Sequence, residues 1–241
     1  MTSYNWNWSI LVTEPYVGWL LRGLVTTVIL ALSSWMIALV LGSIIGVART
    51  LPSALLRWLA TCYVELFRNV PVLVQMFLWF FVLPELVPPD TGRWLKRDLP
   101  HPEFFSAMMC LGLYTASRVA EQVRSGITSV PRGLSAAARA SGMSLAQTYR
   151  YVLLPLGYRI IVPPLTSEFL GIFKNTSIAL TIGVMEITAS SRQIESYTFQ
   201  GYEAFAAATA LYLSIAVCLL WLTRRLEGRT RIPGWIARDQ S

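Results

Sequence analysis

The chain has 241 residues, of which 54% are hydrophobic and 14% are charged, and its mean hydropathy is +0.52. This composition is too apolar and too poor in charge for an ordinary soluble enzyme, and it favours a membrane protein. The net charge of +7 alone would allow nucleic acid binding, but the arginines lie between long apolar runs, as in cytoplasmic loops of membrane proteins, so no nucleic acid partner is expected.

The N-terminal segment, residues 1–18, precedes the first apolar run. It carries Trp6 and Trp8, and tryptophan is enriched where a membrane meets water. No basic stretch stands before a short apolar core, so we expect no cleavable signal peptide. The segment is predicted to lie at the membrane interface on the periplasmic side.

Five apolar runs are long enough to cross a bilayer, because about 20 helical residues span the roughly 30 Å hydrocarbon core. The second run is interrupted by Arg68, Asn69 and Pro71, so we expect it to be kinked. Pro163 and Pro164 should make the first turns of the fourth run irregular. The predicted spans are residues 19–47, 57–86, 104–123, 157–185 and 205–223. The fold class is therefore all-α integral membrane, with five transmembrane helices.

The first span contains small residues at a close-packing spacing. Gly42, Ser43 and Gly46 include the pattern Gly-x-x-x-Gly, which lets two helices approach closely. The partner helix can belong to this subunit or to a neighbouring one, and the pattern does not distinguish the two.

The distribution of Lys and Arg predicts the orientation, because cytoplasmic loops hold the excess. One side of the predicted spans collects most of the arginines, including those between spans three and four and those after span five. With five spans, the N-terminus is then periplasmic and the C-terminus cytoplasmic. We divide the chain into the interfacial segment 1–18, one transmembrane domain 19–224 and a basic cytoplasmic tail 225–241.

The connection between spans three and four, residues 124–155, is far longer than a loop requires. Residues 135–141 are strong helix formers, Gly142 can end a helix in a left-handed conformation, and Ser144 can cap a second short helix. The pattern predicts a helix, a glycine turn and a helix. This pair suits docking into a cleft on a partner protein, and lying on the bilayer surface is the alternative.

The same segment resembles the signature loop of the membrane subunits of bacterial ABC importers. Ala136-Ala137-Ala138, three residues, Gly142, nine residues and then Val152-x-Leu154-Pro155 match the spacing of the family pattern, with Ala136 in place of the usual Glu and Val152 in place of Ile. The resemblance implies a type I importer fold in which this cytoplasmic coupling loop binds an ATPase subunit. The chain itself has no GxxxxGK[ST] phosphate loop, and the ATP site of the family lies on that partner.

Three further stretches, residues 63–75, 163–169 and 174–177, resemble the polar amino acid branch of these permeases, and above all its glutamate and aspartate importers. The resemblance implies a bacterial inner-membrane permease that works by alternating access, without a cofactor. It also implies two copies of the ATPase, a second permease subunit or a second copy of this chain, and a periplasmic amino-acid-binding protein. A permease for basic or neutral polar amino acids, such as histidine, arginine or glutamine, remains the alternative.

Polar residues inside the predicted spans are the candidates for substrate binding, because charges at membrane depth persist when they are paired or line a wet cavity. Arg68 and Gln75 would share a face of span two if its helix continued past Pro71, and Glu168 and Asn175 have the same spacing on span four. We predict that Glu168 binds the ammonium group of the substrate and that Arg68 binds a carboxylate of the substrate. In relatives that import basic amino acids an Asp matches Asn175, so the neutral residue favours an acidic substrate.

Structural roles compete with these assignments. Arg68 can pair with Glu65 on the same helix, and Lys174 can cap a helix break or pair with Glu168. We predict no catalytic site and no metal site, because the three cysteines are isolated, the single histidine, His101, lies in a loop, and no HExxH motif is present. A membrane-embedded enzyme is therefore disfavoured, and the long coupling loop argues against a passive channel.

Overall fold

The structure, a computed structural model, describes residues 4–230, with side chains through residue 225, and this part of the chain contains helices and turns but no strand. The long helices are α1 (Tyr16–Ala48), α2 (Ala54–Asn69), α6 (Pro102–Thr128), α9 (Leu154–Asn175), α10 (Ile187–Thr198) and α11 (Gly201–Thr230). The short ones are η1 (Trp8–Val12), α3 (Val72–Phe77), η2 (Leu78–Val82), α4 (Leu83–Leu86), α5 (Pro89–Arg93), η3 (Trp94–Asp98), α7 (Arg132–Ala140), α8 (Leu145–Thr148), η4 (Tyr149–Leu153) and η5 (Thr176–Ile182).

The five predicted spans correspond to α1, to α2 with α3–α4, to α6, to α9 with η5, and to α11. Of these, α1 and residues Gly201–Arg225 are long and apolar enough to cross a membrane alone. The pair Ala54–Asn69 and Val72–Leu86 qualifies together but is bent by 102°. The predicted basic tail lies mostly outside the described residues.

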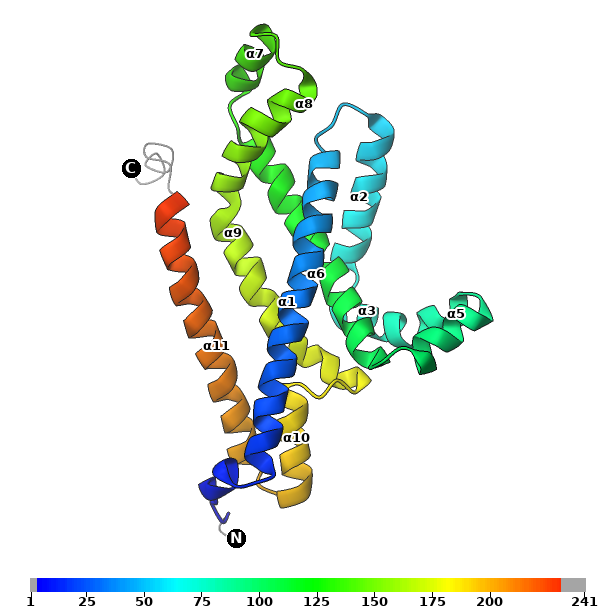
Figure 1. Ribbon diagram of the computed structural model, residues 1–241, viewed down its shortest axis with the longest axis vertical. Coiled ribbons are helices and arrows are strands. Elements are labelled where there is room, and N and C mark those ends of the chain that lie inside the picture. Colours follow the sequence, from blue (N-terminus) through cyan, green and yellow to red (C-terminus); the bar gives the residue numbers. More distant parts are fainter. Residues whose placement is uncertain (1–3, 231–241) are drawn as a thin grey trace.

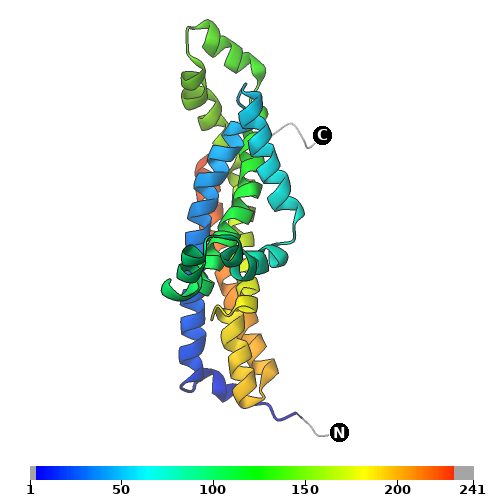
Figure 2. The ribbon, with the colours of Figure 1, turned by 90° about the vertical axis from the view of Figure 1, so that its right-hand side faces the viewer.

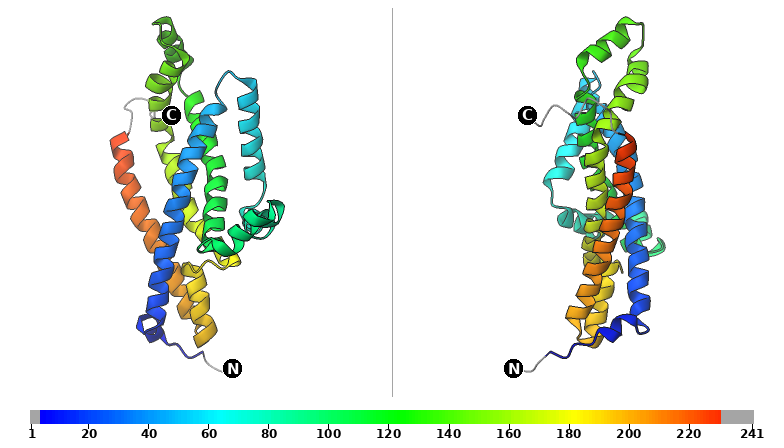
Figure 3. Two further views of the ribbon diagram at one scale, coloured as in Figure 1. Left: turned by 45° about the vertical axis from the view of Figure 1, so that its right-hand side comes forward. Right: turned by 90° about the vertical axis from the view of Figure 1, so that its left-hand side faces the viewer.

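A bundle of α1, α6 and α9 forms the centre of the molecule, and α1 and α6 run side by side in Figures 1 and 3. The glycines of α1 permit this approach: a Cβ on Gly42 would lie 2.6 Å from the Cβ of Val119, and one on Gly46 would lie 2.7 Å from the carbonyl oxygen of Ala120. The small-residue pattern therefore packs within the subunit.

The opposite face of α1 carries an exposed apolar stripe. Val25, Ile29, Met36, Val40 and Ile44 are all more than half exposed, and their spacing of four or seven residues places them along one side of the helix. A stripe of this kind, unfavourable in water, is what lipid or a partner helix covers. The buried core lies on the other side, around Leu30, Met76, Leu111 and Ile172.

The molecule is elongated, and its two ends differ (Figures 1 and 2). At one end, which we name the coupling end, α7 and α8 project beyond the tips of α1 and α2, and the last described turns of α11 point the same way. At the other end lie the N-terminal segment and α10, while the α4–η3 region extends sideways as an arm.

Two predicted irregularities have different outcomes. The kink in span two is confirmed, because α2 ends at Asn69 and Val70 is extended, at φ −93° and ψ 128°. The prediction for Pro163 and Pro164 is wrong, since α9 continues through both. Each proline removes only one backbone donor, and the helix retains its other hydrogen bonds; the irregular turn is instead the π-helix η4, just before α9.

Candidate substrate site and coupling segment

An ion pair joins the two central helices α6 and α9 inside the bundle. The Arg118 Nε donates to Glu168 Oε2 at 2.5 Å. The Glu168 side chain is 11% exposed, whereas that of Arg118 is 47% exposed. Arg118 lies ten residues before the end of α6, about 15 Å along the helix axis, so it is well inside the helix. The pair presents one cation and one anion side by side, which matches the two charges of an amino acid backbone.

Arg68, by contrast, belongs to a second group of charges. Its guanidinium lies 3.7 Å from the Glu121 carboxylate on α6. Arg49, the residue that caps the end of α1, and Arg124 also pair with Glu121. The alternative pairing of Arg68 with Glu65 is not found, because Glu65 accepts a hydrogen bond from Asn69 instead.

Gln75 does not share a helix face with Arg68, because the condition for it, a helix that continues past Pro71, is not met. The chain turns at residues 70 and 71, so α3 starts in a new direction. The Gln75 amide donates to the carbonyl oxygens of Phe67, at 2.9 Å, and Val70, at 2.7 Å. It therefore satisfies backbone groups that the end of α2 leaves without a helical partner, while its buried Oε1 has no hydrogen-bond partner in the described part of the chain.

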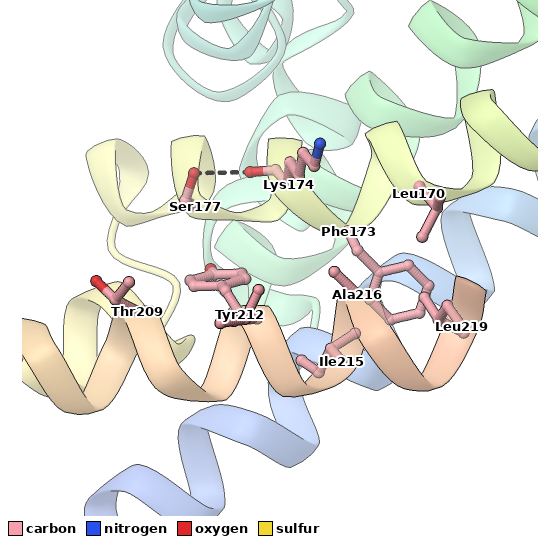
Figure 4. A pocket seen from close by; sticks show the side chains of 10 residues that line it. Leu170, Phe173, Lys174, Ser177, Thr209, Tyr212, Ile215, Ala216 and Leu219 are labelled. Atoms are coloured by element: carbon pink, nitrogen blue, oxygen red, sulfur yellow. Dashed lines mark hydrogen bonds between the residues drawn. The ribbon is translucent and has the colours of Figure 1, made fainter. Parts of the chain in front are cut away.

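Asn175 and Lys174 lie at the last turn of α9, where it passes into η5. Lys174 is exposed and makes no ion pair among the described residues. Of its two structural alternatives, the pairing with Glu168 is not found, because Glu168 pairs with Arg118. Residues of α9, η5 and α11 enclose a mainly apolar cavity of about 460 Å³ (Figure 4). The Lys174 ammonium points away from this cavity in Figure 4, so the cavity is not a polar binding pocket built around it.

The coupling segment has the predicted helix, glycine turn and helix. Ala136, Ala137 and Ala138 lie on α7, and Gly142 follows with a φ of +87°. Ser144 begins α8 with a complete capping box formed with Gln147. Leu154 and Pro155 open α9, so all residues of the predicted motif lie between α7 and the start of that helix.

Two features connect this segment to its surroundings. Leu134, Met143 and Leu145 are each more than a third exposed at the coupling end, which gives the tip an apolar surface. Farther from the tip, the Tyr149 hydroxyl on η4 donates to the carbonyl oxygen of Thr50 at 2.9 Å. The same hydroxyl lies 3.0 Å from the side-chain hydroxyl of Thr50. The coupling segment is thereby bonded to the end of α1, beside Arg49.

Sequence reasoning missed Arg118 and Glu121 as site candidates. Both lie inside the predicted third span, residues 104–123. The signal was present: they are charged residues three apart on a helix that contains few others, and such charges at membrane depth indicate function or pairing. What the pattern lacked was the identity of their partners on other helices.

Comparison with known proteins identifies the family. Residues 38–232 match the family of binding-protein-dependent transport system inner membrane components. The chain is 45% identical over 240 residues to the glutamate/aspartate import permease protein GltJ of Escherichia coli strain K12, covering 96% of this chain and 98% of that protein. It is 31% identical over 231 residues to the glutamate/aspartate import permease protein GltK of Escherichia coli O157:H7, and the match covers 92% of this chain and 99% of that protein.

A solved structure has the same fold. The crystal structure of an amino acid ABC transporter with histidines superposes with a TM-score of 0.79 at 27% identity, covering 95% of this chain and all of that chain. The chain therefore belongs to the family of binding-protein-dependent inner membrane transport components. It is a membrane permease subunit of an ABC importer and a transport component, not an enzyme.

Proposed function

We propose that this chain imports glutamate and aspartate as the permease subunit of an ATP-driven importer. The observation that carries the proposal is the similarity to GltJ along almost the whole chain. The charges around Glu121 and Glu168 agree with an anionic substrate, because five cations, Arg49, Arg68, Arg118, Arg124 and Lys174, outnumber three carboxylates, Glu65, Glu121 and Glu168. Excess positive charge along a pathway raises the local concentration of an anion.

In our proposal the Arg118–Glu168 pair is the centre of the substrate site. A bound amino acid exchanges partners with the pair: its carboxylate takes the guanidinium of Arg118, and its ammonium takes Glu168. Both charges then remain paired throughout, which avoids an isolated charge at membrane depth. Glu168 keeps its predicted role, Arg118 takes the carboxylate role predicted for Arg68, and Asn175 remains a candidate at the end of α9. Gln75 then acts by holding the α2–α3 bend.

The proposed coupling mechanism starts at the exposed tip. Ala136, Ala137 and Ala138 on α7, with Gly142 and the apolar side chains around it, dock on an ATPase subunit. When the ATPases close, the force passes along η4 to Leu154 and Pro155 and so rotates α9, which carries Glu168. Alternating access follows, because the same movement that opens one side of the bundle closes the other.

The proposed assembly contains two ATPases, a periplasmic amino-acid-binding protein and a second permease. Similarity to both GltJ and GltK supports a pair of related, non-identical permeases. The proposed location is a bacterial inner membrane, with the coupling end in the cytoplasm and the N-terminus in the periplasm. The cluster of arginines near the coupling end supports this orientation.

Uptake by the reconstituted complex tests the function. Labelled glutamate is presented to proteoliposomes that contain this chain, its partner permease, the ATPase and the binding protein, with ATP on the ATPase side. We expect ATP-dependent uptake that unlabelled aspartate blocks and arginine, histidine and glutamine do not. Uptake without ATP would contradict the importer, and ATP-dependent uptake of a different amino acid would contradict the substrate.

The alternative, a basic or neutral polar substrate, is tested by Asn175→Asp. The similarity to a transporter solved with histidines is the observation that keeps this alternative open. Under the acidic-substrate proposal, the added carboxylate repels glutamate and lowers its uptake, and it favours a cationic substrate. Unchanged glutamate uptake by the variant would remove Asn175 from the site.

A further inference from the structure

The charges around Glu121 form a group that the proposed substrate site does not use. We name Arg49, Arg68, Glu121 and Arg124 the inner cluster. Three helices supply it: α1 through Arg49, α2 through Arg68 and α6 through the other two. Three guanidinium groups share a single carboxylate, so the cluster carries a net charge of +2.

One member of the cluster is buried with a hydrogen-bonding group unused. The Arg49 side chain is only 10% exposed, and its buried Nε has no hydrogen-bond partner among the described residues. A buried donor without an acceptor is costly. Arg68 and Arg124 are more open, at 45% and 36% exposed, so an anion can reach the cluster from their side.

The position of the cluster relates it to the Arg118–Glu168 pair. Arg118, Glu121 and Arg124 follow one another at intervals of three residues on α6, so each neighbour is about 4.5 Å further along the axis. The series runs from the Arg118–Glu168 pair toward the coupling end, because α6 ends at Thr128 just before α7. The two guanidinium groups of this series, those of Arg118 and Arg124, are therefore about 9 Å apart along the axis, with the Glu121 carboxylate between them.

The cluster is also bonded to the coupling segment. Thr50, the residue after Arg49, accepts the hydrogen bond from the Tyr149 hydroxyl of η4. A displacement of η4 is transmitted directly to the end of α1 and so to Arg49. The positions of the inner-cluster arginines are thus linked to η4, the element that the ATPase moves in the proposed mechanism.

We propose that the inner cluster is a second binding site for a carboxylate of the transported amino acid, occupied after the substrate leaves the Arg118–Glu168 pair and before it reaches the cytoplasm. This inference rests on the proposed function. The carboxylate binds Arg68 and Arg124 in competition with Glu121, and the repulsion from Glu121 keeps its stay short. A lipid phosphate could bind the same guanidinium groups, and the experiment below distinguishes it from the carboxylate of the transported amino acid.

Inhibition from the inside of the vesicle tests the site. The full complex is reconstituted without acidic lipids, the vesicles are loaded with glutamate at a series of concentrations, and initial uptake of external labelled glutamate is measured. Arg124→Gln removes a charge-assisted hydrogen bond, so we expect the luminal concentration for half-inhibition to rise about tenfold. Glu121→Gln should lower it, because the competing carboxylate is gone, and no merely structural defect produces opposite shifts in the two variants.

Matched variants and probes complete the experiment. Arg57→Gln neutralises an exposed arginine of α2 that pairs with no described carboxylate, and it should leave the half-inhibition unchanged. Arg124→Lys retains the charge and should restore most of the inhibition. Luminal glutamine, which lacks the second carboxylate, should inhibit less than glutamate does.

Distinct results would overturn the proposal. An unmodified complex that imports glutamate but is insensitive to luminal glutamate has no such site, and equal inhibition in all variants has the same meaning. If added phosphatidylglycerol, and not glutamate, produces the effects that depend on Arg124, the cluster binds lipid headgroups. If the unmodified complex imports no glutamate, the proposed function itself fails, and this inference fails with it.

Discussion

At the scale of single residues, two carboxylates inside the bundle, those of Glu168 and Glu121, form ion pairs with arginines that other parts of the chain supply. Glu168 bonds to Arg118 from a different helix, and Glu121 bonds to arginines of α1 and α6. A charge at the centre of a membrane helix costs about 2.5–3.5 kcal/mol on insertion scales, so such pairs form wherever helix packing brings opposite charges together. These residues join the helices of the bundle. In the proposed mechanism, they are also the charged groups that exchange ion-pair partners with a bound amino acid.

The Arg118–Glu168 pair gives a prediction at this scale. Arg118→Gln leaves the nearly buried Glu168 without a cation, so we expect a lower thermal midpoint in detergent and at least a tenfold loss of uptake. The double variant Arg118→Gln with Glu168→Gln should recover stability, because no charge is left unpaired, but not transport. A double-mutant cycle on both quantities measures this difference. If the double variant transports as the unmodified protein does, the pair does not bind substrate.

At the scale of elements, two segments depart from straight membrane helices, and each departure has a local cause. The chain turns between α2 and α3 at Val70-Pro71, and Gln75 binds the backbone carbonyls freed there. Gly142 ends the α7 region at a φ of +87°, which side chains other than glycine rarely adopt. The bend orients α3 across the bundle, and the glycine orients α8 toward α9.

The glycine turn gives a prediction for the coupling element. A Cβ added at Gly142 or at Gly133 meets nothing within 4 Å, but only Gly142 has a positive φ. Gly142→Val therefore changes the turn between α7 and α8, whereas Gly133→Val leaves the backbone as it is. We expect the first variant to insert normally and to lose most of its uptake per ATP hydrolysed, and the second to retain it. Equal ratios of uptake to hydrolysis in both variants would contradict a coupling role for the turn.

At the scale of the whole molecule, the two ends have different surfaces. The coupling end projects α7 and α8 with exposed Leu134, Met143 and Leu145. At the far end, the N-terminal segment is bonded to α11, since the Tyr4 hydroxyl donates to Glu203 at 2.5 Å and the Asn7 backbone amide donates to the same carboxylate at 2.7 Å. In the proposed orientation, the coupling end faces a soluble ATPase and the N-terminal end lies on the opposite side of the membrane.

Cysteine labelling tests which end faces which compartment. Cys62 and Cys218 are exposed and are replaced by serine, while the buried Cys110 stays. Single cysteines are then introduced as Ser141→Cys at the coupling end and Ser9→Cys at the other, both at exposed positions. In intact cells, a membrane-impermeant maleimide should label the Ser9 variant only, and inverted vesicles should give the reverse pattern. The opposite result would invert the proposed orientation.

The sequence alone determined the spans, the break after Asn69 and the helix, glycine and helix of the coupling segment. These depend on local properties: the length of apolar runs, the missing donor of proline, the φ freedom of glycine and the capping by serine. The family pattern added the type of transporter, because its motif is contiguous and its spacing is intact here.

The tertiary structure alone decided which charges meet. Arg68 and Gln75 are seven residues apart and would share a face on a straight helix, but the 102° bend separates them. Arg118 and Glu168 are fifty residues apart, and their contact depends on the rotation and depth of α6 against α9. An ion pair requires that side-chain atoms on two helices lie within a few ångströms of each other. That distance depends on how the helices pack and where they bend, and residue spacing along the chain does not encode it.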